Sequence, residues 1–201
     1  MTSVRVLSGP DPEELAHLRG IVDDLGFVVD ASTRLCSLLD GGDADVVLHR
    51  ALYSSAVVAY LRCFGSGHRT RLTEEEFIGI GGAPRAMHEF LKNVRDKHVA
   101  HSVSPFEDAV VLLQVGANGV GEGIAEFLLS QVSADREGVE GLASLADQIR
   151  TRVAARASVV RERVAAAAQL LSLEEVEALP RFEPKEPTAS DAGTTRATRR
   201  R

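Results

Sequence analysis

The hydrophobic residues of the first forty positions recur at the three- and four-residue spacing of an amphipathic helix. The segment DPEE at 11–14 predicts the start of this helix, with its aspartate as the capping residue, and the glycine pair 41–42 predicts the end. A second segment, 45–64, is apolar on two sides and is expected to form a central helix with neighbours on both faces. Arg62 lies on one of these apolar stripes, which is an unusual place for a charge.

The remaining pattern predicts two more long helices and an ambiguous segment between them. Residues 83–101 fit a helix that ends before Pro105, and residues 135–171 fit a long amphipathic helix. Between them, 109–115 has the β-branched run of a strand followed by a glycine-rich turn. The segment 124–132 fits either the return strand of a small hairpin or the start of another helix, and we favour the hairpin.

These elements predict one mainly α-helical domain over residues 1–180. Beyond Pro180 the chain is rich in Pro, Thr, Ala and Arg and has almost no large apolar residues, so the Arg-rich tail 181–201 is expected to be disordered. A chain of 201 residues suffices for one domain with a sizeable core.

Composition and charge restrict the class of protein and its expected location. The net charge of −6 argues against a nonspecific nucleic-acid coat, because such binding neutralises phosphates with Lys and Arg. The two cysteines, Cys36 and Cys63, fit free thiols in a reducing compartment. The N-terminus lacks an apolar run of signal-peptide length, and no stretch approaches the roughly 20 apolar residues that span a bilayer. We therefore expect a cytoplasmic protein without membrane association.

The helix predicted at 83–101 changes character along one face. Projected at about 100° per residue, six residues form a single stripe, bordered by Arg95. They are Met87, Phe90, Leu91, Val94, His98 and His101. The face that begins apolar thus becomes basic in its last two turns.

This combination of Arg and His suits RNA cleavage without a metal ion. One group must remove the proton of the ribose 2′-hydroxyl, another must protonate the leaving oxygen, and a fixed cation must stabilise the charged phosphorane. Histidine can exchange protons near neutral pH. Arginine offers a permanent planar fork to phosphate oxygens. Two copies of the helix facing each other across a two-fold axis would place paired Arg and His around one phosphate.

The segment RDKHVAH, residues 95–101, resembles the motif of HEPN domains. That motif has an Arg, usually followed by a small polar residue, and then a His after a gap of four to six residues. Here five residues separate Arg95 from His101, and Asp96 takes the polar position. The stretch 52–77, LYSSAVVAYLRCF and GSGHRTRLTEEEF, is similar to HEPN-like proteins of bacterial abortive-infection systems. The resemblance spans about residues 15–104 and the long last helix.

The resemblance implies a bundle of four to five helices that dimerises through the motif helices, with a β-hairpin as an insertion after them. It also implies metal-independent endoribonuclease activity on RNA, without a cofactor. The protein would then act as a toxin or antiphage effector, with a cognate antitoxin as a further candidate partner. Arg95 would then stabilise the phosphate, His101 would act as general base or acid, and Asp96 would position one of them. His98 would share the proton transfer.

Other interpretations stay open. HEPN domains also include non-catalytic modules that bind RNA, a nucleotide or a partner protein. A third possibility is a purely structural helical dimer, in which Arg95 and His101 merely pair with carboxylates such as Asp96 or Glu89. The cations at the end of this helix could also simply complement the helix dipole. His98 and His101 form an HxxH pair, but no Glu or Cys at helical spacing completes a zinc site, so no metal is expected. Arg62 is a candidate RNA contact, with an internal ion pair as its alternative.

Overall fold

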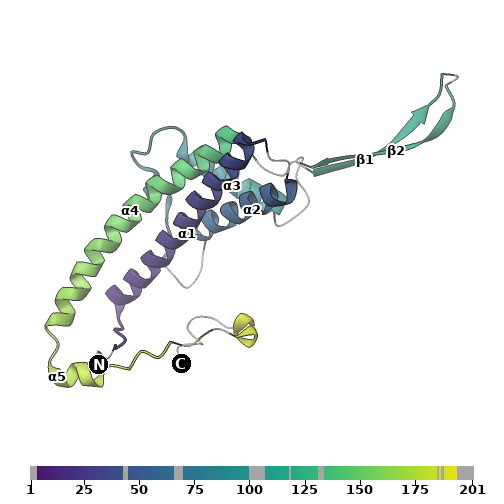
Figure 1. Cartoon of the computed structure of the whole chain (residues 1–201). Coiled ribbons are helices and arrows are strands. Elements are labelled where there is room, and N and C mark those ends of the chain that lie inside the picture. Colours follow the sequence, from purple (N-terminus) through teal and green to yellow (C-terminus); the bar gives the residue numbers. More distant parts are fainter. Residues whose placement is uncertain are drawn as a thin grey trace.

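The computed structural model describes residues 4–42, 45–65, 70–99, 107–117, 119–130, 134–184, 186 and 188–193. Within these ranges the protein is mainly helical, with one two-stranded antiparallel sheet that extends away from the helices (Figure 1). This confirms the fold class that the hydrophobic pattern predicted.

Two long helices, α1 (Pro10–Asp40) and α4 (Arg136–Gln169), lie side by side (Figure 1). Ion pairs near both ends show that they run antiparallel. Arg136, at the start of α4, contacts Asp40 at 2.5 Å, and Arg163, near the end of α4, contacts Asp11 at 2.9 Å. Between these pairs, apolar faces of both helices are buried against each other.

The start of α1 differs from the prediction. The helix begins at Pro10, and Gly9 precedes it with a φ of 118° and no side-chain cap. Asp11 therefore lies inside the first turn, where its carboxylate binds Arg163 instead of capping the helix. Proline suits the first helical position because it needs no amide hydrogen there. The glycine pair at 41–42 ends the helix as predicted.

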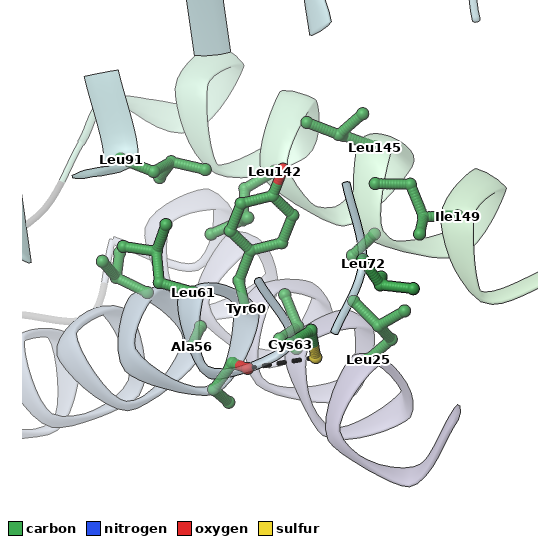
Figure 2. Close-up of a cluster of buried hydrophobic side chains, with 14 of the residues drawn as sticks. Leu25, Ala56, Tyr60, Leu61, Cys63, Leu72, Leu91, Leu142, Leu145 and Ile149 are labelled. Carbon is green, nitrogen blue, oxygen red and sulfur yellow. Dashed lines mark hydrogen bonds between the residues drawn. The ribbon is translucent and has the colours of Figure 1, made fainter. Parts of the chain in front are cut away.

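The helix α2 (Val46–Arg62) packs against α1, and α3 (Pro84–Val94) closes the bundle beside α2 and α4. A short 3-10 helix, η1 (Glu74–Phe77), precedes α3. Figure 2 shows the shared core, in which Tyr60 of α2 is fully buried. Side chains from α1, α3 and α4 share this core with it, among them Leu25, Leu91, Leu142, Leu145 and Ile149.

A β-hairpin follows the motif segment. Its strands β1 (Glu107–Val115) and β2 (Gly121–Ser130) pair antiparallel. The turn between them includes Gly119, whose φ of 76° favours glycine. The favoured hairpin interpretation is thus confirmed, and the helical alternative for 124–132 is excluded over the described part of that segment.

The C-terminal part crosses back to the N-terminal segment. After α4, a capping box between Ser172 and Glu175 starts α5 (Leu173–Ala178). Residues 179–182 then pair with residues 4–6, through an isolated β-bridge between Arg5 and Arg181. The beginning of the predicted tail is therefore attached to the domain. Residues 194–201 lie outside the described residues.

Candidate functional site

The motif segment RDKHV forms a π-helical turn, η2 (Arg95–Val99), directly after α3. A π turn brings residues five apart to the same side, whereas an α-helix places them about 140° apart. Val94 is buried, and Val99 also packs against the core. The π turn therefore lets both valines face inward, and it keeps the segment attached to the bundle on both sides.

This turn corrects the helical projection. The prediction of a regular α-helix to His101 is wrong over 95–99, because the wider π turn rotates these residues away from the positions that an α-helix would give them. The single stripe is also interrupted earlier: Leu91 is buried in the core, while Phe90 is 41% exposed. Extra residues of this kind inside α-helices occur often at functional sites.

Arg95 and Asp96 form an ion pair on the outer side of the π turn. Arg95 Nε donates a hydrogen bond to Asp96 Oδ1 at 2.7 Å, and a terminal guanidinium nitrogen lies 2.5 Å from the same oxygen. The Arg95 side chain is 38% exposed and that of Asp96 is 46% exposed. The aspartate thus holds the guanidinium at the surface.

The held guanidinium keeps binding capacity for an anion. Arginine carries five N–H donors, and the contacts with Asp96 engage the Nε side of the fork. The other terminal nitrogen has no hydrogen bond within the described part of the chain. Its two N–H groups can therefore donate hydrogen bonds to phosphate oxygens.

The structure describes the two histidines of the motif to different extents. His98 lies on the π turn, although the position of its side chain is not described. His101 lies outside the described residues. The arrangement of both imidazoles around Arg95 remains a prediction from the sequence.

Arg62 contacts α1. Its Nε donates a hydrogen bond to Asp24 Oδ2 at 3.1 Å, and a second guanidinium nitrogen contacts Asp24 Oδ1. Asp24 is buried, and the ion pair raises the pKa of Arg62. Among the described residues, no hydrogen bond or ion pair joins Arg62 to Arg95 or Asp96. This arrangement matches the ion-pair alternative for Arg62, and its role as an RNA contact stays a prediction.

The histidine of α3, His88, escaped the sequence analysis. Its Nδ1 lies 3.3 Å from the hydroxyl of buried Tyr60, so the two share a hydrogen bond. Its ring also contacts Phe64 and Phe77, with centroids 4.6 and 5.3 Å away. The spacing of His88, Leu91 and Arg95 along one helical face was the signal that could have indicated a half-buried position.

The aromatic surroundings of His88 predict a pH-dependent stability. Burial lowers the pKa of His88, while the nearby carboxylates of Glu89 and Glu74 act in the opposite sense. The unfolded chain therefore binds this proton first as the pH falls below about 6.5. The free energy of unfolding should decrease from there until the pH passes the lower pKa of the folded state.

Urea unfolding at about pH 7.5 and about pH 5.5 measures this loss of stability. The variant His88→Gln, which keeps a polar side chain but does not titrate, should lose less stability between the two pH values than the wild type. An equal loss in both proteins would contradict the assignment.

Three further features concern metal binding, membrane-spanning helices and the cysteines. Among the described residues, no three His, Cys, Asp or Glu side chains gather as a metal-binding group. No helix in the described ranges is both long and apolar enough to cross a bilayer. Cys36 and Cys63 are both buried free thiols.

Comparison of the chain with protein-family models, with curated proteins and with solved structures found no match. The function is therefore argued from the residues and their geometry.

Proposed function

We propose that this protein is a metal-independent endoribonuclease of HEPN type that acts as a homodimer. The observation that carries the proposal is the π turn at RDKHV, which presents Arg95 at the surface with its guanidinium held by Asp96. The sequence places His98 and His101 three and six residues after this arginine. A role as a toxin or antiphage effector, with a cognate antitoxin, belongs to the same proposal.

The proposed reaction uses the 2′-hydroxyl of RNA as the nucleophile. One imidazole removes the hydroxyl proton while the oxygen attacks the adjacent phosphorus, and a second imidazole protonates the departing 5′-oxygen. The products are a 2′,3′-cyclic phosphate and a free 5′-hydroxyl. Arg95 neutralises the negative charge that grows on the phosphorane oxygens. Two copies of the motif provide both imidazoles and both guanidinium groups around one phosphate.

Incubation of the full chain with total RNA in the presence of EDTA tests this proposal. We expect fragments that end in cyclic phosphate, and we expect DNA of the same sequence to stay intact because it lacks the 2′-hydroxyl. RNA that is bound but never shortened would favour a non-catalytic binding module. Cleavage that stops on addition of EDTA would contradict the metal-independent mechanism.

A further inference from the structure

The hairpin of β1 and β2, residues 107–130, forms an arm that projects away from the helices (Figure 1). We call it the β-arm. Its strands have nine to ten residues, which corresponds to a length of about 30 Å. A two-stranded hairpin alone in water is marginally stable, and each strand has one edge of unpaired backbone groups. The β-arm therefore lacks the packing that normally stabilises such a structure.

Apolar side chains cover both faces of the β-arm. Nine large ones on the two strands have exposed fractions between 39% and 74%: Val110, Val111, Leu112, Leu113, Val115, Ile124, Phe127, Leu128 and Leu129. Together they expose on the order of 1,000 Å², whereas the largest apolar patch of a typical monomer has about 300–600 Å². A stable protein interface buries about 800 Å² on each partner. Both faces of the arm together thus offer the area of a stable complex, and one face offers roughly half of it.

The charges of the β-arm restrict its partner. The arm contains Glu107, Asp108, Glu122 and Glu126 but neither Lys nor Arg. Such an arm is repelled by nucleic-acid phosphates and by anionic lipid surfaces, which bind cationic segments. An uncharged apolar protein surface is the chemistry that suits it.

The two faces of the arm also differ from each other. Glu126 lies opposite Val111 in the middle of one face. The other face pairs Val110 with Phe127 and Leu112 with Ala125, and it bears no charge beyond Asp108 at its base. We call this the uncharged face. The part of this face beyond Asp108 can be buried without removing a carboxylate from water, which would cost several kcal/mol.

The helical body has a hollow that matches this chemistry. A groove of about 460 Å³ lies between the loop before α3, the first turns of α3, and α4. Its lining residues are all uncharged, and they include Ile80, Pro84, Met87, Phe90 and Leu145. The β-arm of the same chain points away from the helices and cannot fill it (Figure 1).

We propose that the uncharged face of the β-arm docks in the groove between α3 and α4 of a second copy of this chain. The chain carries both the inserted element and its receptor, and a two-fold axis lets two copies exchange their arms reciprocally and closes the assembly as a dimer. The inference does not depend on the proposed ribonuclease activity, because none of these residues belongs to the motif RDKHVAH.

The first test is the mass of the purified full chain, measured by sedimentation. The wild type is a dimer, and the double variant Leu112→Asp/Phe127→Asp weakens the dimer about 30-fold or more by placing carboxylates on the uncharged face. Circular dichroism shows unchanged helix content for this variant, because both side chains lie on the arm. The matched control is Leu170→Asp, at an 87% exposed position beside the end of α4, which stays dimeric.

Disulfide crosslinking tests where the arm docks. The native thiols are buried, so introduced cysteines are the accessible ones. A mixture of Leu112→Cys on the arm and Gln148→Cys in the groove forms a mixed crosslinked dimer, whereas Leu112→Cys with Ser158→Cys, exposed further along α4, does not. A monomeric wild type overturns the proposal. Crosslinks only between two Leu112→Cys chains also overturn it, because they show arm-to-arm pairing.

Discussion

Replacement of Arg95 by alanine is expected to slow RNA cleavage about 100- to 1,000-fold, the loss that follows removal of one fixed donor to a charged transition state. In the proposed mechanism the guanidinium binds the phosphorane oxygens, and its hydrogen bond to Asp96 would orient it before the substrate arrives. Single-turnover cleavage of a labelled RNA in EDTA measures this change. Arg95→Lys should recover only part of the rate, because lysine keeps the charge but not the planar fork.

The π turn itself offers the matched control. Lys97 is exposed two residues further along the same turn, so Lys97→Ala removes a positive charge from the same turn but from another side of it. We expect this variant to keep the wild-type rate.

His101→Ala should lose activity about 100-fold or more, since it removes a proton-transfer group. Full activity in both Arg95→Ala and His101→Ala would refute the proposed mechanism. Equal losses of activity in Arg95→Ala and Lys97→Ala would show that the turn contributes only its positive charge and that Arg95 has no specific role.

The core substitution Leu142→Ala should lower the free energy of unfolding by about 2–5 kcal/mol. Leu142 is completely buried on the face of α4 that meets the other helices (Figure 2). Alanine removes apolar contacts and leaves a cavity that rigid neighbouring helices cannot fill. Urea denaturation followed by circular dichroism measures the difference.

The same substitution at an exposed leucine provides the comparison. Leu170 is 87% exposed, so Leu170→Ala should change the unfolding free energy by no more than about 0.5 kcal/mol. A similar loss of stability in both variants would mean that the packing of α4 against α1 is not the main source of stability.

Much of this architecture could be predicted because the long helices carry strong periodicity. The segment 135–171 predicted α4 closely, and the β-branched run at 109–115 with its glycine turn predicted the hairpin. The π turn could not be found in this way. A projection assumes a constant rotation per residue, whereas the π turn follows from the tertiary requirement that Val94 and Val99 both reach the core.

The site was predictable only in part for a related reason. Sequence alone showed that Arg62 occupies an apolar stripe, but its partner Asp24 lies in another helix, and only the packing of α1 on α2 brings the two together. Asp96 beside Arg95 was easier to predict, because the two residues are adjacent in the chain. His88 was missed because its partners, Tyr60 and the aromatic rings, come from α2 and from η1.

The pairing of the first long helix with the last one sets an order for synthesis on the ribosome. Residues 41–160, 120 positions, must be made after α1 before α4 can cover its apolar face up to Val160. At about 5–20 residues per second, this takes roughly 6–24 s. During that interval the nascent chain exposes Leu18, Ile21 and Leu25, which are fully buried in the finished protein. The first helix is therefore the segment that a ribosome-associated chaperone would meet, and truncated chains that lack α4 should aggregate.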